Sequence, residues 1–424
     1  MDKSRVIIDM GLMAESIIGH DLFNPVHLRY AATLDHEIDA ELLAKAWDRT
    51  KRVYPIIDAV FGYDHAVTDY YVEHADIIYA KDHLYLMKPE GGVNDPVRTK
   101  VPVIPSTEAV AGRAISVCYY DRTIFISAYH SLLDGGGMTM VFRTLLYSYL
   151  ALYTGHEDEN PIVELTEGRD LSEYYITASP EYIFKLDYTP VPAYTLPFRC
   201  VGFYDKEMVN DNGNIYCGNV ALNAADFMRL CKENGANPSA MMCAVLGKTA
   251  YALNPDERSD MVFGLTVSTR KLLGLDNSIA NVVGSAIAHG SYDELTAPSL
   301  AEASQRIRKE IDQQRGKDYY LSFSRLSSTY HLDPNFKFWT VTYVGSLNIG
   351  ENNGHIVDFN METNGNSNLY LMQLNDKFVL TLQYGMATQK YLAEFVKVFT
   401  ELGVKAEIIH PAHHVDKDSP TAVL

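Results

Sequence analysis

The chain has 424 residues, of which 47% are hydrophobic and 21% charged, a composition typical of a soluble globular protein with a sizeable core. The net charge of -18 argues against nucleic acid as a partner, because phosphate binding requires a basic surface. No apolar run is long enough to span a bilayer, and the five scattered cysteines lack a Cys-x-x-Cys pair, so we expect a cytoplasmic protein with no membrane span.

The first half alternates predicted strands and helices. Apolar alternation predicts a strand at 26–33, and residues 39–47 follow as an amphipathic helix with an acidic first turn. Two β-rich runs, 114–120 and 123–129, are separated by a two-residue turn and predict a hairpin. A long apolar-periodic segment at 138–153 predicts a helix.

From 155 to 200 the chain becomes acidic and then rich in proline, which indicates a surface crossover between two halves. The second half again mixes both types of element, with strands predicted at 200–222, 262–268, 339–344 and 378–384, and helices at 224–235, 238–253, 299–315 and 389–402. We therefore expect two domains, residues 1–180 and 181–424. The histidines near the end, His410, His413 and His414, are interpreted as a flexible exposed tail rather than a metal site.

His130 is the strongest candidate for catalysis. It lies between the predicted strand 123–129 and the consecutive glycines Gly135 to Gly137, on a turn of the kind that commonly carries functional groups. An imidazole there can take a proton from a hydroxyl or amine and later return it. Asp134 can fix the local backbone or pair with an arginine. A metal site built on His130 and Asp134 lacks a third ligand nearby, so we expect no metal.

The run His130-Ser131-Leu132-Leu133-Asp134-Gly135 resembles the His-x-x-x-Asp-Gly signature of the chloramphenicol acetyltransferase-like superfamily of acyltransferases and condensation domains. Further segments are similar to that superfamily in the expected order, at 34–55, 223–247, 267–270 and 281–284, so the resemblance covers nearly the whole chain. Tyr129 stands where condensation domains and several relatives carry another histidine, and the plant-type Asp-Phe-Gly-Trp-Gly motif is absent. The position of Tyr129 varies across the superfamily, so we do not interpret it as a loss of activity. The absence of the plant-type motif points to the bacterial and fungal relatives.

The resemblance implies an α/β fold, in which two chloramphenicol acetyltransferase-like domains, each an α+β two-layer sandwich, form a pseudo-dimer around an interdomain tunnel. Residues 1–180 would form the domain that carries the motif, with His130 midway along the tunnel. His130 would act as general base without a covalent acyl-enzyme. Acyl-CoA or acyl-phosphopantetheine would be a cosubstrate, and no cofactor would be bound permanently.

Supporting roles follow from the same resemblance. Arg270 would pair with Asp134, and Gly135 would serve the turn and line the site with its amide. The possible oxyanion or tunnel donors are Thr342, Tyr343 and Asn281. The competing interpretations are an exposed strand-end arginine for Arg270 and β-propensity alone for the two strand hydroxyls.

The leading hypothesis is an acyltransferase that moves an acyl group from a small-molecule thioester donor to an alcohol or amine acceptor. One alternative is a free-standing nonribosomal-peptide-type condensation enzyme whose donor rides on an acyl or peptidyl carrier protein. The acidic balance favours a small-molecule donor, since carrier proteins are usually acidic, unless a basic patch such as Arg270-Lys271 or the 306–317 cluster receives the carrier. Another alternative is a non-catalytic binding module of the same fold.

Overall fold

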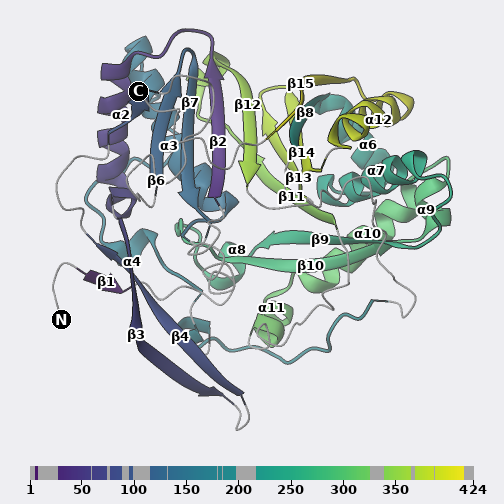
Figure 1. Ribbon diagram of the computed structural model, residues 1–424, viewed down its shortest axis with the longest axis horizontal. Helices are drawn as coiled ribbons and strands as arrows, with labels where there is room; N and C mark the ends of the chain where they lie inside the picture. The colour runs from purple at the N-terminus through teal and green to yellow at the C-terminus, as the bar shows by residue number, and fades with distance from the viewer. Residues whose placement is uncertain are drawn as a thin grey trace.

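The computed structural model places the first half of the chain to the left and the second half to the right in Figure 1. It describes residues 5–7, 27–58, 60–73, 77–87, 95–98, 115–130, 132–178, 180–183, 185–196, 216–324, 339–363, 368–385 and 387–414. Ser131 and Cys200 lie outside these ranges, as does most of the predicted strand 200–222.

Elements of the first half are, in chain order, β1 (Arg5–Ile7), β2 (His27–Leu34), α2 (Ala40–Val53), η1 (Pro55–Asp58), β3 (Val60–Glu73), β4 (Ile77–Met87), β5 (Val97–Arg98), β6 (Ile115–Tyr120), β7 (Thr123–Tyr129), α3 (Gly135–Thr154), α4 (Leu171–Tyr174) and α5 (Pro180–Ile183). The predicted hairpin is confirmed as the antiparallel pair β6 and β7. Helix α2 begins where Asp39 caps it, with the Asp39 carboxylate accepting from the amides of Glu41 and Leu42.

Elements of the second half are β8 (Tyr216–Asn223), α6 (Ala224–Glu233), α7 (Pro238–Leu253), β9 (Met261–Ser268), α8 (Arg270–Leu273), β10 (Val283–Gly290), α9 (Tyr292–Thr296), α10 (Ala301–Gln314), α11 (Lys317–Ser324), β11 (Trp339–Ser346), η3 (Glu351–His355), β12 (Ile356–Thr363), β13 (Asn368–Leu374), β14 (Lys377–Tyr384), α12 (Thr388–Glu401) and β15 (Ala406–His414). The predicted helices at 224–235, 238–253, 299–315 and 389–402 are confirmed as α6, α7, α10 and α12, with small shifts of their ends.

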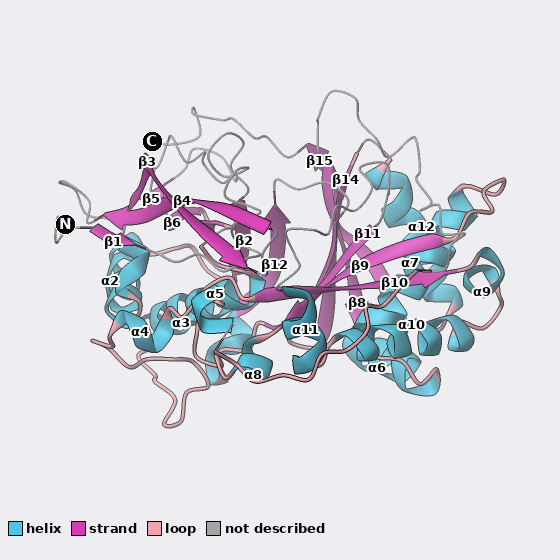
Figure 2. Ribbon diagram, turned by 90° about the horizontal axis from the view of Figure 1, so that it is seen from below, coloured by secondary structure: helices cyan, strands magenta, loops and turns pink. Residues whose placement is uncertain are grey.

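Two large sheets carry the described fold. One has the strand order β12-β2-β7-β6-β5, and the other the order β10-β9-β11-β13-β14-β8-β15. Figure 2 shows most helices gathered on one side of these sheets, so the expected two-layer α/β architecture is confirmed. The exact division into residues 1–180 and 181–424 stays a prediction.

One strand of the second half completes the sheet of the first. Strand β12 pairs antiparallel with β2, and Figure 1 shows the two side by side. Phe359 of β12 is buried in the same hydrophobic cluster as Tyr30 of β2, with the two rings edge to face at 5.4 Å between centroids. The apolar core around α2 and α3 is therefore built from both halves of the chain.

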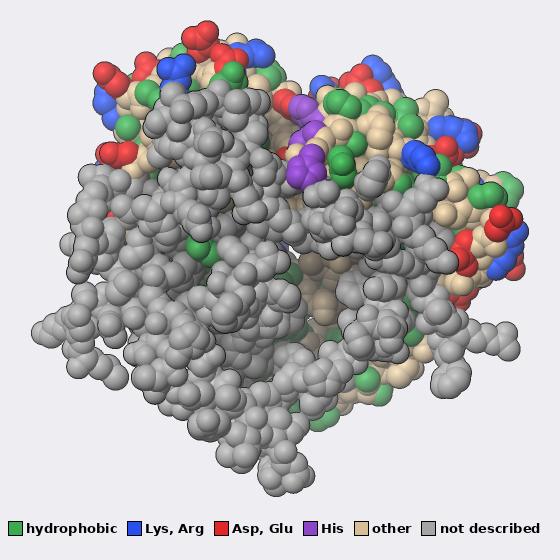
Figure 3. Space-filling view, viewed as in Figure 1, with side chains coloured by type: hydrophobic (Ala, Val, Ile, Leu, Met, Phe, Trp, Pro, Cys, Tyr) green, Lys and Arg blue, Asp and Glu red, His purple; other side chains and the backbone are tan. Residues whose placement is uncertain are grey.

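The other face of β12 is polar and meets the last strand. His410 bonds to Asp358 at 2.5 Å, and His413 lies 3.4 Å from Glu362. The interpretation of His410, His413 and His414 as a flexible tail is wrong, because they belong to β15, which pairs with β8. The first two meet these carboxylates, and the His414 ring packs edge to face on Tyr216. Figure 3 shows histidine side chains gathered on this face of the molecule, over the region where β15 approaches β12.

Because β12 pairs with β2, we expect the buried side chain of Phe359 to stabilise the first half of the chain. Phe359→Ala should lower the free energy of unfolding by about 3–5 kcal/mol, because a buried aromatic ring is lost and a cavity remains. Val357 on the same strand is 46% exposed, so Val357→Ala is a matched control that should stay within about 0.5 kcal/mol of wild type. Denaturant titration followed by circular dichroism measures both, and similar unfolding midpoints for the two variants would contradict the shared core.

Candidate active site

His130 follows the last residue of β7 and is half-buried. Its Nδ1 lies 3.1 Å from the carbonyl oxygen of Leu133. A carbonyl can only accept a hydrogen bond, so Nδ1 carries the proton, and the lone pair of the neutral ring is then on Nε2. The turn thus fixes both the ring and the tautomer of a potential general base.

Asp134 is a buried carboxylate with every oxygen occupied. Arg270 donates to both of its oxygens, from Nη1 at 2.9 Å and from Nη2 at 2.7 Å. The amides of Gly137 and Val282 donate to the same carboxylate at 2.8 and 3.0 Å, and the first of these bonds caps α3. Only 4% of the Asp134 side chain and 9% of the Arg270 side chain are exposed. Asp134 is therefore an anchoring group, with no oxygen free for proton transfer.

Arg270 extends this anchor into the segment that follows it. Its Nε donates to the carbonyl of Ser278 at 2.7 Å, and Nη2 also reaches the carbonyl of Ala280 at 2.9 Å. Ala280 forms an isolated antiparallel bridge with Leu133, and the Asn281 side-chain amide donates to the carbonyl of His130 at 2.8 Å. The segment from Arg270 to Asn281 therefore holds the His130 turn from the side of the second half.

The three glycines are closely packed around this turn, and Gly137 has the least room for a side chain. A Cβ at Gly137 would lie 1.9 Å from the carbonyl oxygen of Ile279, and one at Gly136 would lie 2.8 Å from Nη1 of Arg270. At Gly135 the nearest atom would be Cγ1 of Val344, at 2.9 Å. A larger residue at Gly137 would meet rigid backbone and push the two segments apart.

Two buried hydroxyls that the sequence interpretation missed also hold the turn. Tyr30 from β2 and Thr139 from α3 both donate to the carbonyl of Gly135, at 3.0 and 2.7 Å. Burial raises the pKa of the Tyr30 phenol above its usual range, so this hydroxyl keeps its proton and remains a donor. The His-x-x-x-Asp-Gly motif gave no signal for Tyr30, which lies a hundred residues upstream and pairs with the turn only through the sheet.

The three candidate oxyanion donors, Thr342, Tyr343 and Asn281, have different positions relative to the His130 turn. Thr342 pairs with Tyr370 of β13, and residues paired across two strands point to the same face of the sheet. Tyr370 belongs to the hydrophobic cluster of the first half that also holds Tyr30 and Leu133, so Thr342 faces the His130 turn. Tyr343 is on the opposite face and packs on the hydrophobic cluster of the second half, with its ring centroid 6.1 Å from that of Phe378. The amide of Asn281 lies at the turn itself and donates one hydrogen bond to the His130 carbonyl. Of the two strand hydroxyls, only that of Thr342 is on the side of the His130 turn.

One arginine of each basic cluster is engaged in internal ion pairs. Arg270 is held by Asp134, and Arg306 pairs with Glu294 at 2.6 Å and with Glu310 at 2.7 Å. Although burial opposes the shift, the hydrogen bonds from Arg306 and Ser291 lower the pKa of Glu294 to about 2, so this pair stays charged at neutral pH. Arg270 and Arg306 therefore serve the fold, whereas the other basic residues of these clusters are exposed: Lys271, Arg308, Lys309, Arg315 and Lys317.

The other sequence expectations concern cysteines and membranes. Within the described residues Cys118, Cys217, Cys231 and Cys243 are free and buried, and burial raises the pKa of the Cys243 thiol above its usual range. None of the described helices has the length and apolar character that crossing a bilayer requires.

No protein-family model and no curated protein matches the sequence. Solved structures do match. F. graminearum TRI101, complexed with coenzyme A and T-2 mycotoxin, has a TM-score of 0.59 at 12% identity, covering 97% of this chain and all of its own. The trichothecene 15-O-acetyltransferase TRI3 from Fusarium sporotrichioides has 0.59 at 15% identity, covering 94% of this chain and 96% of its own.

Polyketide synthase associated protein 5 from Mycobacterium tuberculosis matches as well, with a TM-score of 0.58 at 11% identity over 94% of this chain and 99% of its own. These structures all have the chloramphenicol acetyltransferase-like fold. At the level of the fold, the resemblance drawn from the motif is therefore confirmed.

The buried ion pair predicts a large penalty for removing one partner. Asp134→Ala should lower the free energy of unfolding by about 3–5 kcal/mol, because the Arg270 guanidinium is left buried without its carboxylate and α3 loses its cap. The double variant Asp134→Ala/Arg270→Met should lose less than the sum of the two single variants, since no charge is left alone. Chemical denaturation of all three variants tests this, and strict additivity would contradict the coupling.

Proposed function

We propose that the protein is an acyltransferase that moves an acyl group from acyl-CoA to an alcohol or amine, with His130 as the general base. The observation that carries the proposal is the His130 turn, which presents Nε2 as the basic nitrogen and is clamped from both halves of the chain. Such rigid placement of one imidazole is what proton transfer to a bound acceptor requires. The two halves would enclose His130 in a tunnel that both substrates enter.

The chemistry needs only this base and an oxyanion donor. Nε2 of His130 takes the proton of the acceptor hydroxyl or amine as that oxygen or nitrogen attacks the thioester carbonyl carbon. The carbonyl oxygen becomes an oxyanion, which the Thr342 hydroxyl would stabilise. The carbon–sulfur bond then breaks, and the leaving thiolate takes the proton back from the imidazolium, so the ring ends each cycle neutral.

The solved structures support the donor class. The F. graminearum TRI101 structure holds coenzyme A, and TRI3 is named as an O-acetyltransferase. The net charge of -18 also favours a small-molecule donor over a carrier protein, which is itself usually acidic. Cytoplasmic location stays a prediction.

Removal of the imidazole is the direct test. With a panel of acyl-CoA donors and mixed alcohol and amine acceptors, His130→Ala should release free thiol about 10²–10⁴-fold more slowly than wild type, because general-base catalysis contributes that much. Thiol release is followed with a colorimetric reagent, and circular dichroism checks that the variant is folded. Equal rates for wild type and variant would reject the catalytic assignment. Release only from acyl carrier protein would favour the condensation alternative.

The assignment of Thr342 as oxyanion donor is tested by comparing it with its neighbour Tyr343. Thr342→Val should lower kcat by about 10²–10³-fold, because it removes the hydroxyl while keeping the shape of the side chain. Tyr343→Phe is the matched control, since it also removes one hydroxyl but from the opposite face of β11, and its kcat should stay within about twofold of wild type. Steady-state kinetics measure both variants. A larger loss in Tyr343→Phe than in Thr342→Val would overturn the assignment.

A further inference from the structure

Away from the His130 turn, three metal-ligating side chains converge where α3 ends. His156 and Asp158 lie in the loop that follows α3, and Glu351 begins η3, nearly two hundred residues later. His156 Nε2 is 2.8 Å from Glu351 Oε2 and 3.8 Å from Asp158 Oδ1. One donor atom from each of the three side chains lies within 4.8 Å of the other two. A single ion can therefore contact all three.

Asp158 shows that this group is incomplete on its own. Its side chain is only 7% exposed, and one oxygen, Oδ2, accepts the amide of Glu351 at 3.2 Å. The other oxygen, Oδ1, is buried and, among the described residues, has no hydrogen-bond partner. A buried carboxylate oxygen without a donor is costly, and a cation beside it removes that cost. Of the two Asp158 oxygens, Oδ1 is the one that pairs with His156 Nε2, so it points into the cluster.

The backbone is adapted to this carboxylate. A Cβ at Gly350 would lie 1.9 Å from Asp158 Oδ2, so only glycine permits the carboxylate to sit against the start of η3. Gly350 also has a φ of +96°, which side chains rarely adopt. The amide of Asp158 itself donates to the hydroxyl of Tyr147 on α3 at 3.1 Å. The buried oxygen is thus held in place by the surrounding structure.

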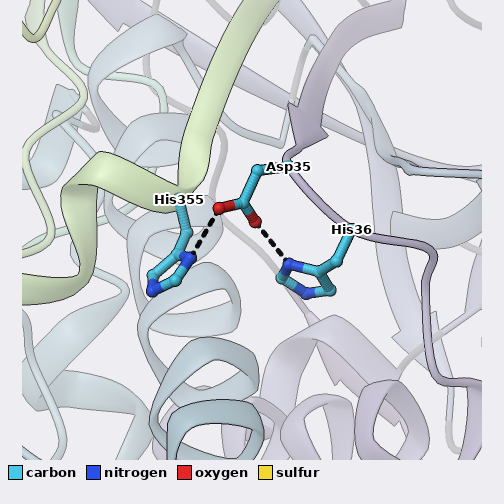
Figure 4. A group of neighbouring side chains, drawn as sticks. All are labelled: Asp35, His36 and His355. Carbon is cyan, nitrogen blue, oxygen red and sulfur yellow. Dashed lines mark hydrogen bonds and ion pairs between the residues drawn. The ribbon is translucent and has the colours of Figure 1, made fainter.

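A second group of ligand type, at the other end of η3, differs in this respect. Figure 4 shows Asp35 between His36 and His355, whose Nδ1 atoms lie 2.6 and 2.9 Å from its two oxygens. Both carboxylate oxygens are therefore already satisfied by ring N–H groups. His36 Nε2 is buried without a hydrogen-bond partner among the described residues, but it is a ring nitrogen and not a carboxylate oxygen, so this group leaves no buried negative charge unsatisfied.

We propose that His156, Asp158 and Glu351 bind one Zn²⁺ ion, with water at the remaining position. A set of one imidazole nitrogen and two carboxylate oxygens suits Zn²⁺, and the imidazole disfavours Ca²⁺ and Mg²⁺, which prefer oxygen ligands alone. His156 and Glu351 are 55% and 73% exposed, so the ion has access from solvent and room for its water. The strongly acidic protein draws cations to this surface.

The ion would join two distant parts of the chain. The α3 loop belongs to the first half, while η3 leads directly into β12, the strand that crosses to the first sheet. Bound Zn²⁺ would therefore clamp the end of α3 to the start of the crossing strand. Because the ion binds the folded arrangement and not the unfolded chain, it stabilises the fold by mass action.

The test is Zn²⁺ binding to the full chain after treatment with EDTA. Isothermal titration with ZnCl₂ should give a site in wild type whose affinity falls at least about tenfold in Glu351→Gln and in His156→Gln, since each removes one ligand. Glu159→Gln is the matched control, because it removes the same charge from the same loop at an exposed residue outside the cluster, and its affinity should match wild type. Zn²⁺ should likewise raise the melting temperature of wild type and Glu159→Gln more than that of Glu351→Gln.

Other Zn²⁺ sites could contribute to the titration, so the position is tested separately. Crystals soaked in ZnCl₂ should show an anomalous peak at about 2.0–2.2 Å from His156 Nε2 and the two carboxylates. A peak elsewhere with none at this cluster would overturn the proposal. So would equal affinity in wild type, Glu351→Gln and His156→Gln, or the absence of Zn²⁺ binding to wild type. Circular dichroism without zinc checks that the variants keep the fold, which two exposed side chains should permit.

Discussion

The buried ion pair between Asp134 and Arg270 is the constraint on which the rest of the structure depends. Removing two charges from water costs several kcal/mol, and the attraction between them repays this only when every donor and acceptor is used. Here the geometry is complete, because the carboxylate receives two guanidinium and two amide N–H groups, and the guanidinium also reaches the carbonyls of Ser278 and Ala280. The pair therefore specifies one arrangement of the two halves more than it adds net stability.

This arrangement explains why the residues around His130 are so small and so closely packed. The guanidinium can reach Asp134 only if the segment around Ile279 approaches the first turn of α3, and Gly137 leaves room for that approach. The same approach brings the amide of Asn281 to the carbonyl of His130. Each contact thus fixes the imidazole indirectly, through backbone groups on both sides of it. A base placed this way stays oriented without a carboxylate partner on its own ring.

The motif, the hairpin and the main helices could be predicted from sequence because they depend on local spacing. Asp134 and Arg270 could be paired only through the resemblance, since nothing local links residues so far apart. Strand β12 was missed, although Phe359 and Met361 alternate with Asp358 and Asn360 as in a strand with two different faces. Its crossing to β2 could not be predicted, because pairing between distant strands leaves no periodic signal. The histidines of β15 were misjudged for the same reason, since their carboxylate partners lie on β12.

Strand β12 contacts both the core of the first half and the last strand of the second half. One face of the strand adds Phe359 to the core beneath α3, and the other presents Asp358 and Glu362 to β15. Helix α3 is therefore held at both ends by the second half of the chain, at its start through Asp134 and Arg270 and at its end through the loop that meets η3. A helix fixed at two points cannot tilt without breaking one of them. Since the His130 turn leads directly into α3, the position of the imidazole depends on contacts well outside the motif that identifies it.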